Sequence, residues 1–364
     1  MSVNYSLDAA TASGLLLFHK KIKEYTFPAF AIFIILFRLK GSLWKLIWRE
    51  MLGWTVLIVF LYMVYVNLLK GSEYEPYYKL LIDMTKDVPT DGTLTFLLSY
   101  MTYNSLTRWQ DTFKCLAWPE NVAFLYKQYC NKKAMTEHEA KCLNRSVARY
   151  LTVFYILLFR DVSSDVRDLF PTFKDLVQPG ILTADEVNLL KSSRLNANSP
   201  HYWVPIDWIV VLIRSRYKSG RHAKDSIMTE VQYKTFITEI NKLRGRTGDV
   251  LSYDWVPLPL ALFQSLTIFV YSTLIVNCFQ MQGRIITSGK SGFSELFVES
   301  MSTLPFSMLY LSFQRISQVI INPFGQDDDD FEVQYLIDRH IKVLNEILCS
   351  DDNETISTSE SGKR

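Results

Sequence analysis

The distribution of apolar and charged residues along the chain predicts two long membrane helices. Met51 to Leu69 contains no charged residue over 19 positions, and Trp255 to Gly283 contains none over 29. An α-helix needs about 20 predominantly apolar residues to cross the hydrocarbon core of a bilayer. We therefore expect each of these stretches to span a membrane.

Two further stretches are apolar but carry polar residues. Leu296 to Asn322 is apolar except for Glu299 and Arg315, and Gly92 to Thr107 is uncharged but rich in Ser and Thr. Polar groups at membrane depth are tolerated where they face protein or water. We expect residues 296–322 to form a helix that leaves the hydrocarbon before Arg315. Residues 92–107 should form a helix whose polar face lines an aqueous path.

Loop charges predict the orientation of this four-helix arrangement. Residues 70–91 carry three basic and five acidic residues, whereas residues 1–50 carry seven Lys/Arg and residues 108–254 carry 22. Cytoplasmic loops near membrane helices are enriched in Lys and Arg. We therefore place both termini and the middle segment in the cytosol.

One apolar stretch near the start fits two interpretations. Tyr25 to Phe37 is uncharged over 13 residues and contains Pro28. That length suits a buried or interfacial helix better than a membrane span. If the stretch did span, the N-terminus would lie outside the cell.

The rest of the chain is predicted to be helical. Tyr150–Phe159 and Trp203–Ile213 have the length of core helices, and Thr183 precedes acidic residues as an N-cap does. No alternating β pattern of useful length occurs. We predict an all-α membrane protein with these parts: a cytosolic or interfacial segment 1–50, membrane helices in 51–107, a cytosolic helical region 108–254, membrane helices in 255–322, and an acidic turn and tail 323–364.

Composition excludes several classes of protein. Apolar residues make up 49% of the chain and charged residues 21%, which excludes a disordered or fibrous protein. The five cysteines form no CxxC pair, so we expect reduced, structural thiols. The histidines are dispersed, and no P-loop or G-x-S-x-G motif occurs. We therefore expect neither an enzyme nor a nucleic-acid partner.

An acidic turn is the clearest local motif. Asn322 to Glu332 contains four consecutive aspartates, flanked by Pro323, Gly325 and two phenylalanines, directly after an apolar stretch. Oxygen ligands that converge on a tight turn suit Ca²⁺, although the EF-hand pattern is missing. A solvated acidic turn after a membrane helix fits the same residues.

The chain resembles a known family, the bestrophins. The motifs that carry the resemblance are spread over most of the sequence: Tyr5, Ala10, Lys40-Gly41-Ser42, Trp44-Lys45, Arg108-Trp109, Trp118-Pro119, Arg160, Val162-Ser163, Phe170-Pro171, Trp203-Val204-Pro205, Leu243-Arg244, Tyr253-Asp254-Trp255 and the run from Ile321 to Glu332.

The resemblance implies a function and a calcium site. Bestrophins are pentameric, Ca²⁺-activated anion channels with four membrane helices per subunit and a helical cytosolic region. A plasma-membrane channel for chloride and other small anions is implied, surrounded by lipid and assembled from this chain alone or mixed with paralogues. The family's calcium clasp falls on the carboxylates of Asp327 and Asp330 and on the backbone carbonyls of Ala10, Val319 and Asn322.

The resemblance also places the pore. The family's narrow neck falls on Gly92, Phe96 and Tyr100, and its cytosolic aperture on Val231. Gly92 and Tyr100 depart from the apolar residues expected there. A non-conducting subunit that keeps the fold and the Ca²⁺ site is therefore an alternative. A second departure is an apolar insertion near residues 17–34, which lengthens the chain between Ala10 and the Lys-Gly-Ser motif.

Overall fold

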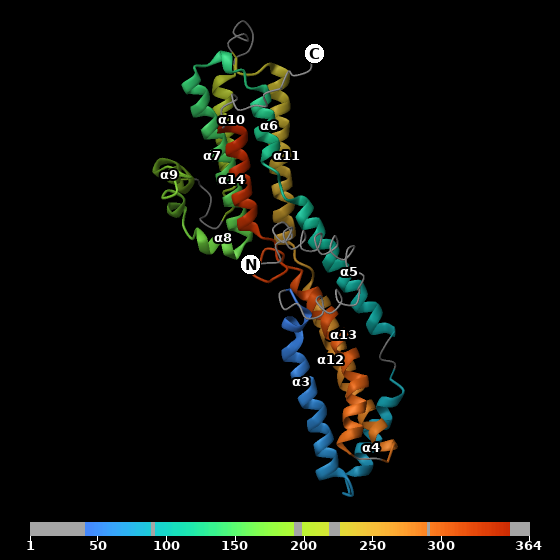
Figure 1. The fold of residues 1–364 in the computed structure, drawn as a ribbon. Helices are drawn as coiled ribbons and strands as arrows, with labels where there is room; N and C mark the ends of the chain where they lie inside the picture. The colour runs from blue at the N-terminus through green and yellow to red at the C-terminus, as the bar shows by residue number, and fades with distance from the viewer. Residues whose placement is uncertain (1–40, 89–91, 193–198, 218–225, 290–291, 350–364) are drawn as a thin grey trace, which may run out of the picture. The chain divides into compact units, whose positions relative to one another are not determined.

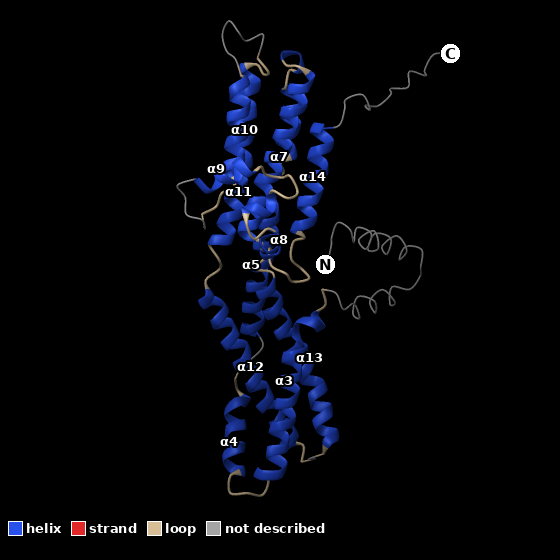
Figure 2. Ribbon diagram, turned by 90° about the vertical axis from the view of Figure 1, so that its left-hand side faces the viewer, coloured by secondary structure: helices blue, strands red, loops and turns tan. Residues whose placement is uncertain are grey.

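The computed structural model describes residues 41–88, 92–192, 199–217, 226–289 and 292–349. Within these ranges the chain is built from helices and connections and contains no strand, which confirms the all-α prediction (Figure 1 and Figure 2). Ala10 and the predicted insertion at residues 17–34 lie outside the described residues. The chain divides into two compact units, which we call the first and second unit.

The first unit comprises the described residues up to Asp111, Val256–Pro323 and Asp327–Asp330. Its helices are α3 (Leu43–Val64), continued by a π-helical turn (Tyr65–Leu69), α4 (Glu75–Lys86), the part of α5 (Gly92–Cys115) up to Asp111, α12 (Leu260–Thr287) and α13 (Phe293–Val319). Helix α13 packs against both α12 and α3, and α4 packs against α12.

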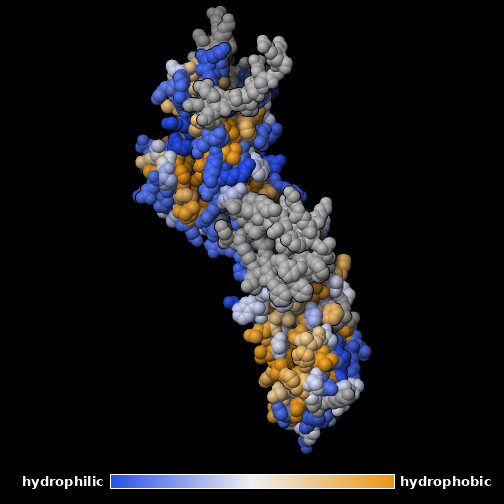
Figure 3. Space-filling view, viewed as in Figure 1, coloured by the Kyte–Doolittle hydropathy of each residue, from blue (hydrophilic) through white to orange (hydrophobic). Residues whose placement is uncertain are grey.

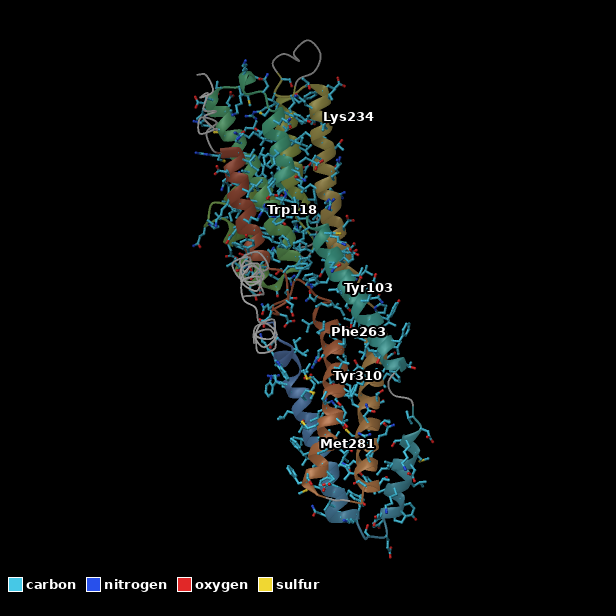
Figure 4. All side chains as sticks on the ribbon, turned by 45° about the vertical axis from the view of Figure 1, so that its right-hand side comes forward. Tyr103, Trp118, Lys234, Phe263, Met281 and Tyr310 are labelled. Carbon is cyan, nitrogen blue, oxygen red and sulfur yellow. The ribbon has the colours of Figure 1, made fainter. Side chains whose placement is uncertain are left out.

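The first unit is apolar outside as well as inside. Met281 of α12 and Tyr310 of α13 belong to its buried core (Figure 4). Large apolar side chains such as Leu52, Phe60 and Ile268 are exposed on the outer faces of the helices. Apolar residues also gather on the part of this surface that Figure 3 shows. A surface of this kind suits contact with lipid or with another protein chain.

Two helices of the described chain are long and apolar enough to cross a membrane. They are Leu43–Leu69 and Leu260–Thr287, and they contain most of the two stretches that the hydropathy pattern favours. Helices α5 and α13 do not meet the same test of length and composition. Four membrane helices therefore remain a prediction.

Helix boundaries differ from the predicted ones at three places. Helix α5 continues past Thr107 to Cys115, because neither Gly nor Pro occurs before Pro119. Helix α12 begins at Leu260, after Pro257 and Pro259, so Trp255 instead ends α11. Residues 70–91 contain α4, which the charge count did not predict.

The second unit comprises Thr112–Trp255, Phe324–Gln326 and the residues from Phe331 onward. Its helices are α6 (Glu120–Tyr129), α7 (Glu137–Val162), α8 (Ser164–Leu169), α9 (Ala184–Ser192), α10 (Trp203–Arg216), α11 (Glu230–Trp255) and α14 (Val333–Cys349), with 3₁₀ turns at Lys132–Ala134 and Phe173–Leu176.

Helix α7 is the centre of the second unit. All residues from Val153 to Phe159 are buried, as the charge-bounded apolar stretch predicts, and α10 and α14 pack against this helix. The predicted N-cap of α9 is present, because Glu186 N donates to Thr183 Oγ1 and Thr183 N donates to Glu186 Oε2. Helix α14 is the main difference from the prediction, since it is a core helix and not part of a tail.

Candidate functional site

The acidic turn brings together the two aspartates whose carboxylates the family resemblance assigns to calcium. Helix α13 ends at Val319, and the connection to α14 contains Asp327–Asp330. The amide of Asp327 donates to Asp330 Oδ2 at 2.7 Å, and the amide of Asp330 donates to the Asp327 carbonyl at 3.2 Å. Asp330 is only 4% exposed. These reciprocal bonds close a tight turn around the Asp330 carboxylate.

Asp328 fixes the turn to the start of α3. Its Oδ2 accepts hydrogen bonds from Gly41 N at 3.2 Å and from Lys45 Nζ at 2.6 Å. Gly41 adopts a φ of 62°, which glycine reaches without strain, and Ser42 caps α3 by accepting from Lys45 N. Gly41 of the Lys-Gly-Ser motif therefore places a backbone amide on the turn, and Lys45 of the Trp-Lys motif places an ammonium group there.

The acidic turn carries a high density of negative charge. Four carboxylates are consecutive in sequence, and Lys45 binds one of them. Burial raises the pKa of Asp329, and the negative charges of Asp328 and Asp327 raise this pKa further, whereas the charge of Lys45 lowers it. Asp329 also borders a cavity of about 640 Å³ with mostly apolar walls. A cation site at this turn stays a prediction.

The donor atoms fit a hard cation if the backbone contributes. Among the described residues, no group of three or more His, Cys, Asp or Glu side chains is arranged to hold a metal ion. The last four carbonyls of a helix have no intrahelical partner and carry the negative end of the helix dipole. Val319 ends α13, so its carbonyl is a suitable further ligand by this argument. Asn322 lies three residues beyond the helix end, and its role stays a prediction, whereas Ala10 lies outside the described residues.

The three predicted neck residues lie on α5. Gly92 is its first residue, and Phe96 and Tyr100 follow at four-residue spacing. Phe96 is 70% and Tyr100 55% exposed, whereas Leu94 and Leu98 on the opposite face are buried in the core of the first unit. A Cβ atom built on Gly92 meets no other atom within 4 Å. An aromatic stripe is thus left open on this helix.

Val231 lies at the start of α11, where Thr229 caps the helix. The amide of Gln232 donates to Thr229 Oγ1, and Gln232 Oε1 accepts from Thr229 N. This reciprocal pair holds the first turn, and the Val231 side chain is 75% exposed. The structure therefore presents an aliphatic side chain to the surface of the chain at this position, and its role as an aperture stays a prediction.

A buried polar network in the second unit was not found by sequence reasoning. His340 of α14 lies 2.8 Å from Glu120 Oε1 through Nδ1 and 3.1 Å from the Tyr155 hydroxyl through Nε2. Arg339 donates to the same Glu120 oxygen, and its guanidinium lies over the ring of Trp118 (Figure 4 labels Trp118). We call these residues the Glu120 network.

The network ties three helices together. It joins α6, α7 and α14 through residues up to 220 positions apart in sequence, so periodicity could not indicate it. The available signal was the apolar spacing of Val333, Ile337, Leu344 and Leu348, with His340 on the same face. That spacing predicts a helix with one buried face.

Comparisons with known proteins agree with the resemblance. A family model described as "Bestrophin, RFP-TM, chloride channel" matches residues 1–350. Bestrophin-3 of Homo sapiens is 31% identical over 332 residues, covering 90% of this chain and 47% of the relative. Bestrophin homolog 15 of Caenorhabditis elegans is 30% identical over 371 residues, covering 99% of this chain and 65% of the relative.

Solved structures share the fold at low sequence identity. A bacterial bestrophin homolog from Klebsiella pneumoniae superimposes with a TM-score of 0.56 at 16% identity, covering 83% of this chain and 97% of the other. The chain thus spans 47% and 65% of the lengths of the two curated relatives and nearly all of the bacterial protein.

Proposed function

Because the chain belongs to the bestrophin family, we propose that it forms an anion channel opened by cytosolic Ca²⁺. In this proposal four helices of each subunit cross the plasma membrane, both termini are cytosolic, and five subunits surround a pore that conducts chloride and other small anions. Mixed pentamers with paralogues are compatible with the same architecture. The observation that carries the proposal is the family match over residues 1–350.

The acidic turn supports calcium as the activating ligand. Asp327 and Asp330 would contribute carboxylate oxygens, and Val319, Asn322 and Ala10 would contribute carbonyls, a ligand set that suits Ca²⁺. Ca²⁺ supplies positive charge that lowers the repulsion among neighbouring aspartates. The protein's part is to hold these oxygens: Asp330 through the amide of Asp327, and the turn itself through Lys45 and Gly41.

The open face of α5 supports the neck assignment. Five copies of Phe96 around an axis would form an apolar ring that controls the passage of ions by excluding water. The edges of aromatic rings carry partial positive charge and therefore suit a partly dehydrated anion. Leu94 and Leu98 anchor the opposite face of the helix in its own subunit.

Whole-cell recording tests the channel directly. Cells that express the chain should show a chloride current that increases as cytosolic Ca²⁺ reaches micromolar concentrations. Surface biotinylation verifies that the protein reaches the plasma membrane. Absence of current in cells with surface protein would contradict conduction by the homomer.

Asp327→Asn tests the clasp. Asp327 is exposed, so its substitution leaves the buried Asp330 carboxylate in place. Losing one charged ligand should raise the half-activating Ca²⁺ concentration by about tenfold or more, as loss of a metal's supporting groups typically does. Asp185→Asn, the same change at an exposed position of α9, is the matched control. Equal dose responses for the two variants would remove Asp327 from the clasp.

A modulatory, non-conducting subunit is the second candidate, and Gly92 favours it. Five glycines at the start of α5 would leave the neck without its first apolar ring. Such a subunit would reach the surface and assemble but give no current alone, and it would change the current of a co-expressed paralogue. Gly92→Ile, which the open space around this residue accommodates, should then restore a gated current to the homomer.

A further inference from the structure

A partly buried hydrogen bond connects the helix that carries the neck residues to the helix that precedes the acidic turn. Thr102 Oγ1 on α5 and Ser317 Oγ on α13 are 2.8 Å apart, and both residues belong to the first unit. Ser317 is fully buried. In Figure 4, the labelled Tyr103 is the neighbour of Thr102, and Tyr310 lies two turns before Ser317 on α13.

Each hydroxyl also has an acceptor on its own helix. Thr102 Oγ1 lies 2.8 Å from the Leu98 carbonyl, and Ser317 Oγ lies 2.7 Å from the Phe313 carbonyl. Three hydrogen bonds require three protons, but two hydroxyl groups supply only two. When the bond between the helices forms, one hydroxyl must therefore release the carbonyl of its own helix.

This competition gives the pair two arrangements of similar energy. With the helices together, one hydroxyl donates across the interface. With the helices apart, both hydroxyls donate to their own carbonyls, so neither proton is left buried without an acceptor. Leaving a buried polar group unpaired is what makes most buried hydrogen bonds costly to break. In this pair no polar group is left unpaired in either arrangement. A small free-energy bias is therefore enough to shift the equilibrium between the bond across the interface and the bonds within each helix.

The pair lies between the two features assigned to gating. Along α5, Thr102 follows Phe96 by six residues, or about 9 Å of helix. Along α13, Ser317 precedes Val319 by two residues and Asn322 by five. A small rotation or shift of the end of α13 would thus reach the Ser317 hydroxyl first and the neck segment of α5 next.

We propose that the Thr102–Ser317 hydrogen bond couples the acidic turn to the neck. The proposal rests on the calcium-gated channel proposed above and adds the residues that transmit the signal. Binding of Ca²⁺ at the turn biases the position of the end of α13, which changes the balance between the bond across the interface and the bonds within each helix. Thr102 and Ser317 are positioning residues in this scheme, since neither contacts the ion or the anion.

Thr102→Val and Ser317→Ala, alone and combined, test the coupling. Val has the shape of Thr without the hydroxyl, and Ala removes only the Ser oxygen. The purified channel is recorded in planar bilayers, and the ratio of open probability at saturating Ca²⁺ to that without Ca²⁺ is measured. Each single variant should lower this ratio about three- to tenfold, which is the range expected for one hydrogen bond. The double variant should lower it no further than the singles.

Three variants serve as controls. Thr102→Ser keeps the hydroxyl and should behave as the wild type. Thr55→Val on α3 and Ser302→Ala on α13 remove hydroxyls that donate to carbonyls of their own helices, and they should leave the ratio unchanged. Size-exclusion chromatography and thermal melting of each variant separate a change in coupling from loss of assembly.

The outcomes separate this proposal from the one on which it rests. A wild type gated by Ca²⁺ whose ratio is unchanged in Thr102→Val and Ser317→Ala overturns the coupling alone. Effects that add in the double variant also overturn it, because two residues acting through one bond cannot add. A wild type without Ca²⁺-dependent current overturns both proposals.

Discussion

Two groups of carboxylates, one in each unit, differ in how their charge is balanced. In the second unit Glu120 is 6% exposed, and both Arg339 and His340 contact its Oε1. In the first unit, Asp327–Asp330 are four acids in a row, and Lys45 binds one of them. Burial alone would raise the pKa of Glu120, but the hydrogen bonds and charges of His340 and Arg339 lower it overall. The pKa of Asp329 is instead raised, by burial and by its acidic neighbours.

Under the proposed function, this difference would separate a structural carboxylate from carboxylates that bind a ligand. A buried carboxylate with its own counter-charge is satisfied once the protein folds, so it holds helices together. Consecutive carboxylates in a turn repel one another, and a bound cation would relieve that repulsion. The predictions that follow test this division, beginning with the largest expected effect.

Glu120→Gln should strongly destabilise the second unit. The variant keeps the size of the side chain but leaves the buried His340 and the partly exposed Arg339 beside a neutral group, and loss of hydrogen bonds to a charged group typically costs about 1.5 to 3 kcal/mol. Chemical unfolding of the purified protein measures this loss, which should be the same with and without Ca²⁺. Glu137→Gln, which breaks an exposed pair with Lys141, should change the free energy of unfolding far less, because water screens this pair. Similar losses in both variants would show that the Glu120 network has no special structural role.

Asp161→Asn should stabilise the protein at neutral pH. Burial raises the pKa of Asp161 to about 6, against the opposing charges of Arg160 and Arg167, and its Oδ2 is a buried atom with no hydrogen-bond partner among the described residues. Because this pKa is higher in the folded state, the stabilisation is complete below the unfolded pKa and is lost as pH rises through 6. The variant should therefore gain roughly 1 to 2 kcal/mol at pH 7.5, after a discount for partial exposure.

Unfolding curves at two pH values check the sign. The difference between Asp161→Asn and wild type should shrink as pH falls and vanish only well below the unfolded pKa of 3.8, where Asp161 is uncharged in both the folded and the unfolded state. A variant that is less stable than wild type at pH 7.5 would mean that the folded protein stabilises the charged Asp161 carboxylate, which would contradict the prediction.

Asp328→Asn should have the smallest effect on stability. Its partner Lys45 has a largely exposed side chain, and water and salt screen exposed ion pairs, so this pair adds little to stability. Thermal melting without Ca²⁺ should therefore change little, and Lys45→Met should change it equally. A loss of stability comparable to that of Glu120→Gln would show that the turn is a structural element like the Glu120 network. The two groups of carboxylates would then not differ in role.

Much of the fold could be predicted from local patterns. The charge-free stretches predicted the two membrane-length helices, and the apolar stretch Tyr150–Phe159 predicted the buried part of α7. Both predictions succeeded because apolar residues are the ones that leave water. Helix α4 was not predicted, because the charges of residues 70–91 were used only to place this segment relative to the membrane. Helix α14 was missed because the acidic run drew the C-terminal residues into one segment, although their apolar spacing was helical.

The site was predictable only in part, since its members are joined by long-range contacts. Asp327 and Asp330 are near neighbours in sequence, so their meeting follows from a tight turn. The bond from Asp328 to Lys45 joins residues 283 positions apart, and that from Thr102 to Ser317 joins residues 215 apart. His340 appeared as an isolated histidine for the same reason. Its partners are set by the packing of α14, which local sequence does not encode.

If the acidic turn binds Ca²⁺ as proposed, the aromatic pair that flanks the run bears on the speed of the response. Phe324 and Phe331 meet edge to face with ring centroids 5.6 Å apart, so the six residues between them form a loop with closed ends. The conformational entropy of such a loop is lost when the protein folds and not when an ion arrives. Binding then requires little more than exchange of water for protein oxygens. A loop prepared in this way can follow a brief rise in ion concentration, where one that had to fold first would lag behind.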